Sequence, residues 1–192
     1  MWKQLGTVLE MLVVLTFLTG IIYPLVITGI AQGVFPRQAN GSLVKQGGTV
    51  IGSELIGQSF TQAKYFHGRP SAAGEDGYDA TASSGSNLGP TNEKLQKSAV
   101  QRIDQVREEN GLDAEKPIPS DLVLASASGL DPHISPETAY LQISRIAKER
   151  GLVEEDVRIL VDKHVQGRQL GILGEPRVNV LALNLALDQM GK

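Results

Sequence analysis

The feature that most constrains the fold is a continuous apolar stretch near the N-terminus. From Thr7 to Val34, Glu10 is the only charged residue, and most positions hold Leu, Val, Ile, Phe, Gly or Thr. Its uninterrupted part, residues 11–31, is about 20 residues long, which at ~1.5 Å per helical residue matches a hydrocarbon layer of ~30 Å. The sequence therefore predicts a transmembrane anchor over residues 7–34, preceded by a short tail over residues 1–6.

A cleaved secretory signal is the alternative explanation of this stretch. The apolar region of such a signal is usually only about 7 to 15 residues long and ends at a small-residue cleavage site. Gly29-Ile30-Ala31 resembles such a site, whereas the length of the stretch, Glu10 and Pro24 favour an uncleaved anchor. Pro24 is expected to kink the helix, because proline disrupts the helical hydrogen-bond ladder.

Small residues along the anchor offer positions where another helix can approach closely. Gly29 and Gly33 form a small-xxx-small pair, which is typical of close helix packing in membranes. The alternative is that Gly and Thr are simply common in membrane spans. The positions that we expect to pack against a partner helix are Thr16, Gly20, Gly29 and Gly33.

The rest of the chain, residues 35–192, is polar and is predicted to form one soluble domain. The formal net charge of -3 gives no field that would hold nucleic acid, and the absence of cysteine excludes disulfides and thiolate metal sites. Lys3 on one side of the anchor and Arg37 and Lys45 on the other hardly decide its orientation. A short tail followed by one span is the usual layout of a protein with a cytoplasmic N-terminus and an extracytoplasmic domain.

The residue pattern of this domain predicts an α+β fold that is helix-rich towards the C-terminus. Short apolar pairs in the Gly-, Ser-, Asn- and Pro-rich part indicate strands, and capping residues with helically spaced apolar positions indicate helices. The strands are expected near 43–44, 50–51 and 65–66. The helices are expected over 92–110, over 136–150 after a Ser135 cap, over 154–165 with a stop at Gly167, and over 179–190 with an Asn179 cap, the last with a strand as the alternative.

The sequence lacks the motifs of phosphate chemistry. It has no Gly-rich loop ending in Gly-Lys-Ser/Thr, and Asp162-Lys163 is followed by His164 rather than by Thr-Gly. It also lacks Gly-x-Ser-x-Gly, and only three histidines are available as bases. No catalytic residue and no metal ligand is therefore assigned, although Ser126 or Ser128 with His133 remains the combination that an anchored hydrolase would use.

Two groups of polar loops are the candidate contact sites. One runs from Ala125 to Pro136 and leads into a helix N-terminus, where free N–H groups can bind an anion or a polar partner. The other comprises residues 67–71 and 83–92. In both, the alternative is a turn whose side chains only fix their own backbone. The candidate residues for contact with a partner or nucleotide are His67, Arg69, Ser84, Ser86, Asn87, Ser128, Asp131 and His133.

Five strings, in this order, carry a resemblance to a known family: YFHGRPS (65–71), YDA (78–80), SSGSNLGPTN (83–92), residues 128–136, and GILGEPRVNVLALN (171–184). Together with the apolar N-terminus, they make the chain similar to the small C subunit of the bacterial Kdp-type potassium-transporting ATPase. The resemblance covers nearly the whole chain.

This resemblance implies a non-catalytic accessory subunit of an inner-membrane complex that imports potassium at the expense of ATP. Its implied partners are a channel-like potassium-binding subunit and a P-type ATPase subunit. The implied role is to stabilise the assembly and to act as a catalytic chaperone that raises the ATP affinity of the hydrolysing subunit. ATP, through a proposed ternary complex, is the only cofactor implied. A membrane-anchored extracytoplasmic binding module or hydrolase is the alternative function.

Overall fold

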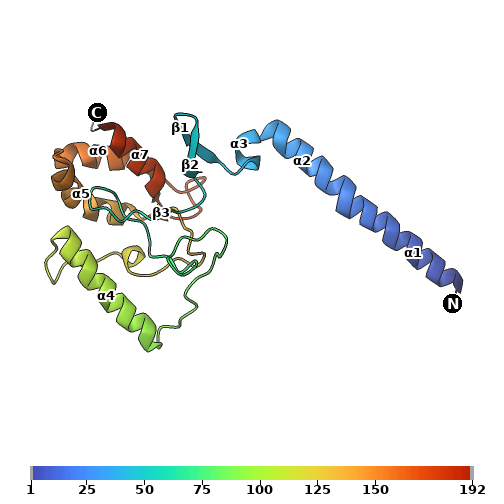
Figure 1. Ribbon diagram of the computed structural model, residues 1–192, viewed down its shortest axis with the longest axis horizontal. Coiled ribbons are helices and arrows are strands. Elements are labelled where there is room, and N and C mark those ends of the chain that lie inside the picture. Colours follow the sequence, from blue (N-terminus) through green and yellow to red (C-terminus); the bar gives the residue numbers. More distant parts are fainter. Residues whose placement is uncertain (1, 191–192) are drawn as a thin grey trace. The chain divides into compact units, whose positions relative to one another are not determined.

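The computed structural model describes residues 2–190, and the chain divides into two compact units, residues 1–51 and 52–192 (Figure 1). The tail predicted over 1–6 and the domain predicted to end at 192 include Met1 and residues 191–192, which lie outside the described residues.

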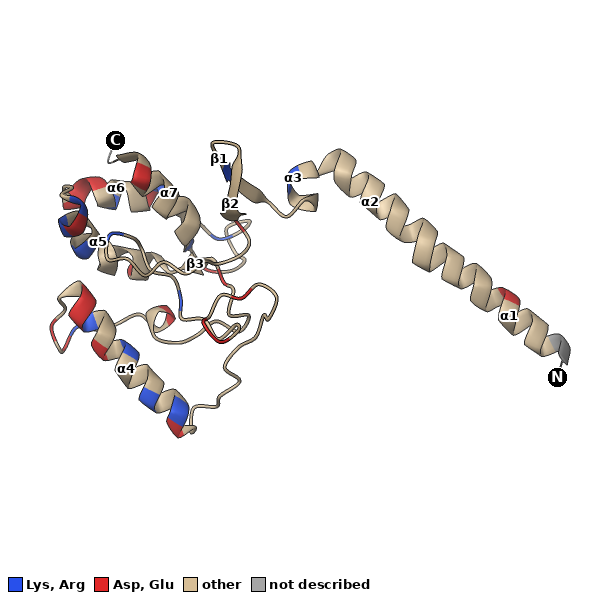
Figure 2. Ribbon diagram, viewed as in Figure 1, with Lys and Arg blue, Asp and Glu red and all other residues tan. Residues whose placement is uncertain are grey.

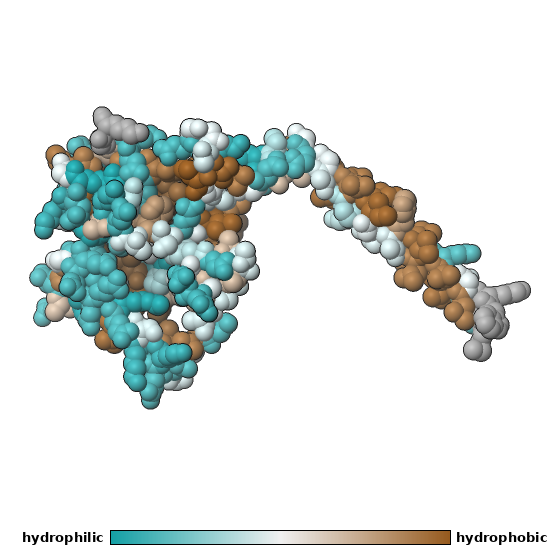
Figure 3. Space-filling view, viewed as in Figure 1, coloured by the Kyte–Doolittle hydropathy of each residue, from teal (hydrophilic) through white to brown (hydrophobic). Residues whose placement is uncertain are grey.

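A long apolar helix dominates the first unit. It consists of α1 (Trp2–Phe17), a π-helical turn (Leu18–Ile22) and α2 (Tyr23–Val34). Its part from Gln4 to Val34 is long and apolar enough to cross a membrane, and no residue of its apolar window is buried within the protein. Glu10 is the only charged residue from Gln4 to Val34 (Figure 2), and the surface of this part is predominantly hydrophobic (Figure 3). The predicted N-terminal apolar helix is confirmed.

The π-helical turn lies directly before Pro24 and is explained by it. Proline has no N–H group, so the helical hydrogen bond that residue 24 would donate is lost. The Tyr23 N–H instead donates to the Leu18 carbonyl, five residues back, which widens the turn. The disturbance expected from Pro24 therefore takes the form of a local π turn.

A short helix and a hairpin complete this part of the chain. Helix α3 (Pro36–Ala39) is followed by β1 (Leu43–Gln46) and β2 (Thr49–Ser53). Gly47 and Gly48 connect the strands with φ of 58° and 86°, a conformation that favours glycine in a two-residue hairpin turn. The strands predicted near 43–44 and 50–51 are confirmed.

The second unit contains four longer helices, a short 3₁₀ turn and a small sheet. Its strands pair antiparallel in the order β3-β5-β4, with Val178 of β5 opposite Ile134 on one side and Val165 on the other. The elements are α4 (Glu93–Asn110), η2 (Ser120–Leu122), β3 (His133–Ile134), α5 (Pro136–Arg150), α6 (Glu154–His164), β4 (Val165–Gln166), β5 (Arg177–Asn179) and α7 (Val180–Met190).

Capping side chains start α4, α5 and α7 where the sequence predicts. The Asn92 side chain accepts from the Lys94 N–H, Ser135 Oγ accepts from the Thr138 N–H, and Asn179 Oδ1 accepts from the Ala182 N–H. Helix α6 ends at His164, one residue before the predicted end at Val165. The reason is that Val165 leaves the helix to pair with β5.

The core lies between α5, α6, α7 and the small sheet, and Phe66 reaches it from a loop. The strand predicted at 65–66 is wrong, because side chains rather than a neighbouring strand satisfy this backbone. The Phe66 N–H donates to Asn184 Oδ1, and Asn184 Nδ2 donates to the Phe66 carbonyl. The fully buried core residues include Phe66, Ala139, Ile146, Val157, Val161, Val178, Leu183 and Leu187.

Candidate functional site

Some of the candidate polar residues belong to two side-chain clusters, and the others, Ser84, Ser86, Asn87 and Ser128, lie in loops. All of them are in the second unit. The His67 cluster comprises His67, Glu109, Asn110, Gln142 and Arg145. The Arg69 cluster comprises Arg69, Tyr78, Asp131 and His133. The two clusters adjoin, because His67 and Arg69 line a common small pocket, whereas His133 belongs to the Arg69 cluster alone.

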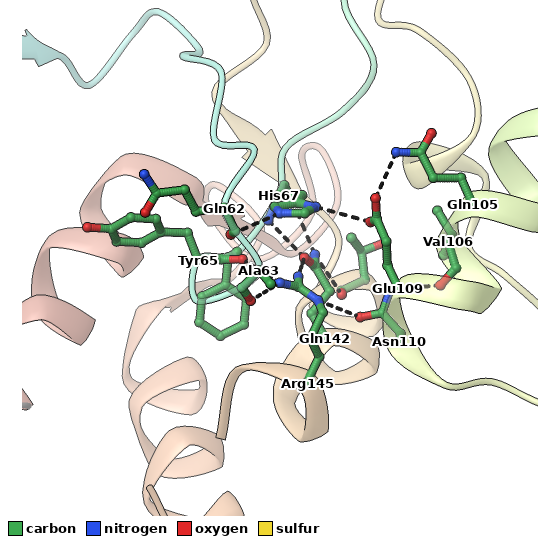
Figure 4. A network of polar contacts seen from close by, with 12 residues as sticks. Gln62, Ala63, Tyr65, His67, Gln105, Val106, Glu109, Asn110, Gln142 and Arg145 are labelled. Atoms are coloured by element: carbon green, nitrogen blue, oxygen red, sulfur yellow. Dashed lines mark hydrogen bonds and ion pairs between the residues drawn. The ribbon is translucent and has the colours of Figure 1, made fainter. Parts of the chain in front are cut away.

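The His67 cluster joins a loop to two helices (Figure 4). Gln142 of α5 accepts from the His67 N–H at 2.8 Å and donates to the His67 carbonyl at 3.2 Å. The imidazole Nδ1 lies 3.4 Å from a carboxylate oxygen of Glu109 on α4, and Nε2 lies 3.2 Å from the Gln62 carbonyl. Burial and the charge of Arg145 lower the pKa of His67, against the opposing effect of these two acceptors.

Arg145 is the centre of this cluster and is only 7% exposed. Its guanidinium donates to the carbonyls of Ala63 and Tyr65, to Asn110 Oδ1 and to Gln142 Oε1. Burial lowers the pKa of Arg145. Because the direct acceptors are neutral oxygens of the protein itself, the arrangement is that of a buried structural cation rather than of a site open to a ligand.

The Arg69 cluster is more exposed. Arg69 Nη1 lies 3.1 Å from Asp131 Oδ2, and Asp131 Oδ1 accepts from the His133 N–H at 3.0 Å. Burial would raise the pKa of Asp131, but hydrogen bonds from His133 and Arg69 and the charge of Arg69 outweigh it and hold the pKa below its usual range. The Tyr78 hydroxyl donates to the Arg69 carbonyl, and burial together with the charge of Asp131 raises the pKa of Tyr78 to about 12.

The Arg69 cluster forms part of the wall of an open groove of about 1020 Å³. The groove combines apolar and proline side chains with both signs of charge. The Tyr140 ring lies on it, with the Arg158 guanidinium 5.5 Å from the ring centre. Its lining includes Arg69, Lys116, Ile118, Asp121, Asp131, His133, Ile134, Tyr140, Leu141, Arg158, Glu175, Pro176 and Arg177.

The serines of the candidate loops mainly fix the backbone. Ser84 Oγ donates to the Ala72 carbonyl, and Ser128 Oγ accepts from the Leu130 N–H. Ser86 and Asn87 are exposed, and Asn87 has a φ of 53°. For Ser84 and Ser128 the geometry matches the alternative of turns held by their own side chains.

The geometry gives an anchored serine hydrolase no support. Among the described residues, no hydrogen bond joins the hydroxyl of Ser126 or Ser128 to His133. Ser126 is 5% exposed, and His133 Nδ1 lies 3.5 Å from Asp131 Oδ1. A nucleophile and its base need to be within hydrogen-bond reach.

The sequence did not identify several residues on which the site depends. Gln142, Arg145 and Asn184 lie on helix faces predicted only from their apolar neighbours, and a buried polar residue gives no signal in such a pattern. Tyr140, Arg158 and Arg177 meet on the groove from three separate elements. Neither group has a local motif, because each is assembled by the tertiary fold.

A long apolar helix followed by a folded unit fits the class of single-pass membrane proteins. Residues 5–189 match the family model described as KdpC: K+-transporting ATPase, c chain, and the chain belongs to this family. It is 58% identical to the potassium-transporting ATPase KdpC subunit of Myxococcus xanthus, over 98% of this chain and 89% of that protein. It is 56% identical to that of Gemmatimonas aurantiaca (99% and 94%) and 55% identical to that of Mycobacterium tuberculosis (99% and 100%).

Proposed function

We propose that the chain is a non-catalytic accessory subunit of an ATP-driven potassium import complex, in which it stabilises the assembly. The observation that carries this proposal is the family match over residues 5–189, which includes both the apolar helix and the folded unit. The relatives are named as subunits of a potassium-transporting ATPase. The missing phosphate motifs fit a chain that leaves ATP hydrolysis to a P-type ATPase subunit and ion conduction to a channel-like subunit.

The apolar helix is proposed to pack against helices of these partners within the membrane. A Cβ atom added at Gly20, Gly29 or Gly33 would meet nothing within 4 Å, so these positions leave room for another helix backbone. Gly29 and Gly33 lie one turn apart and form the contact face, and Thr16 and Gly20 form a second face. The remaining surface faces lipid.

The proposed location is the cell inner membrane, with a cytoplasmic N-terminus, a span over residues 7–34 and an extracytoplasmic domain over residues 35–192. Because the chain has no cysteine, a single Val100→Cys variant on the exposed side of α4 gives one reactive thiol. A membrane-impermeant maleimide should label it in cells whose outer membrane is permeabilised. Labelling only after disruption of the inner membrane would show that the domain is cytoplasmic, which contradicts the proposed orientation.

The chain is also proposed to act as a catalytic chaperone that raises the ATP affinity of the hydrolysing subunit. We place this effect in contacts between subunits rather than in a nucleotide held by this chain. The guanidinium of Arg145 is occupied by internal oxygens, and Arg69 is paired with Asp131. A subunit can raise the ATP affinity of its partner by binding better to the partner's ATP-bound state.

Co-purification from membranes that contain all three subunits tests the assembly. A tag at Lys192 should recover two large membrane subunits and potassium-stimulated ATP hydrolysis. Gly29→Leu with Gly33→Leu should reduce that recovery, and Gly6→Leu is the matched control, because Gly6 is equally open but lies outside the predicted contact face. Recovery of the chain alone from gently solubilised membranes would contradict the proposal.

An anchored extracytoplasmic binding module is the second candidate function. The observation in its favour is that Arg69 lines the groove and that its buried Nε has no hydrogen-bond partner among the described residues. A bound polar group would satisfy this donor. This function predicts a small-molecule ligand that saturates the isolated full-length chain, whereas the accessory-subunit function predicts none.

A further inference from the structure

The loop between β4 and β5 presents apolar side chains to solvent. Leu170 is 90% exposed, Ile172 is 76% exposed and Leu173 is 55% exposed. Single exposed apolar residues are common on protein surfaces, but three within four positions at the end of one loop form a local apolar projection. We call residues 170–173 the apolar tip.

The apolar tip is held in one conformation by its own loop. Gln169 and Leu173 exchange backbone hydrogen bonds, each of 2.9 Å. At the base of the loop, Arg168 Nη2 donates to both carboxylate oxygens of Glu175, at 2.9 Å and 2.7 Å. Because little conformational freedom remains to be lost, a partner that binds the tip has a small ordering entropy to overcome.

The backbone of the tip is also strained. Leu170 has a φ of 54°, a conformation that disfavours a leucine side chain and usually belongs to glycine or asparagine. A leucine that is both strained and almost fully exposed gains nothing within the folded unit. Such an outlier indicates that the side chain serves a contact outside this unit.

On the basis of the proposed function, we infer that the apolar tip docks into an uncharged, apolar socket on a protein partner of the complex. Lipid is the less suitable occupant, because residues 168–176 contain no Trp, Tyr or Lys, and their only cation, Arg168, is already paired with Glu175. That internal pairing also leaves no net charge at the base of the tip, which suits an apolar protein surface. Residues 175–177, which follow the tip and lead into β5, line the groove. A partner bound to the tip therefore lies close to the groove as well.

Site-specific photocrosslinking in membranes identifies the occupant. A benzophenone amino acid at position 172 keeps an apolar side chain there, and the same residue at position 100, an exposed valine on α4, is the control. The expected result is a crosslink from position 172 to one of the two large co-purifying subunits and none from position 100. A crosslink to lipid, a crosslink to a second copy of this chain, or no crosslink would each overturn the inference.

A substitution distinguishes this inference from the proposed function. Leu170→Asn with Ile172→Asn removes the apolar surface and places at position 170 a residue that tolerates its φ. The variant should dissociate from the purified complex about tenfold faster or more, with no fall in the thermal midpoint of the full-length chain in detergent. Val100→Asn is the matched control and should behave as the unaltered chain.

The outcomes are separable. If the unaltered chain co-purifies and the Leu170→Asn, Ile172→Asn variant dissociates at the same rate, the inference fails and the proposed function stands. If the thermal midpoint falls markedly, the tip belongs to the fold and the inference is also wrong. If the unaltered chain does not co-purify, both are wrong.

Discussion

The His67 cluster and the Arg69 cluster contain the same kinds of side chain in different surroundings. Each has one histidine, one arginine and one carboxylate. In the His67 cluster, Arg145 is 7% exposed and bound to neutral oxygens. In the Arg69 cluster, the side chains of Arg69 and Asp131 are 28% and 30% exposed and lie on an open groove. The first cluster holds elements together, whereas the second presents polar groups at a surface.

This difference shows why residue type alone did not locate a site. His67 and His133 looked equivalent in the sequence, each in a polar loop. Their side chains are similarly exposed, 20% and 24%, but His67 is bonded to α4 and α5, whereas His133 lies on an edge strand beside the groove. Substitutions should therefore affect folding in the first cluster and have small effects on folding in the second.

Arg145→Met is expected to have the largest effect. It removes the cation and with it the hydrogen bonds that the Ala63 and Tyr65 carbonyls and the Asn110 and Gln142 side chains accept, although Gln142 still accepts from the His67 N–H. The free energy of unfolding should fall by about 3–5 kcal/mol, because each acceptor left without its donor costs up to about 1–3 kcal/mol. Urea unfolding of the full-length chain in detergent, followed by circular dichroism, measures it. A loss below about 1 kcal/mol would show that the cluster is not a structural centre.

Asn184→Ala should rank second. The substitution leaves both backbone polar groups of Phe66 buried without partners, at a cost of about 1–3 kcal/mol for each unsatisfied group, partly relieved by water. We expect a loss of about 2–4 kcal/mol in the same unfolding experiment. Asn184→Asp keeps the acceptor but places a carboxylate at a 1% exposed position beside the Phe66 carbonyl, so at neutral pH it should lose at least as much stability as Asn184→Ala.

The pH dependence of stability should reflect His67. Its folded-state pKa lies below the ordinary value of about 6.5, so the unfolded chain binds the proton more readily. The unfolding free energy should therefore fall as the pH drops through about 6.5 towards the folded-state pKa. The groups facing the ring are Glu109 on α4, Arg145 on α5 and the Gln62 carbonyl. His67→Gln should flatten this part of the profile, and His133→Gln is the control; an unchanged profile for His67→Gln would contradict the assignment.

The Arg69–Asp131 pair should contribute least to folding. A part-exposed ion pair is usually worth about 0.2–1 kcal/mol. A double-mutant cycle with Arg69→Gln and Asp131→Asn should give a coupling energy in this range, and unfolding in urea measures it. A coupling energy above about 2 kcal/mol would place this pair with the structural cluster and remove the contrast between the two.

Much of the fold was predictable from local signals. The apolar helix follows from its composition, and α4, α5 and α7 start at caps readable in the sequence, Asn92, Ser135 and Asn179. The segment at Tyr65-Phe66 was not predictable, because its backbone partners include side chains far along the chain, Asn184 and Arg145. The groove was not predictable either, since its walls come from separate elements.

The most direct test of the account is an ATP titration of potassium-stimulated hydrolysis by the two large subunits, with and without this chain. We expect no hydrolysis by the chain alone. We also expect that adding the chain lowers the apparent KM for ATP about fivefold or more, within the usual range of coupling between sites. Hydrolysis by the chain alone, or the same KM and the same potassium stimulation in its absence, would contradict the account.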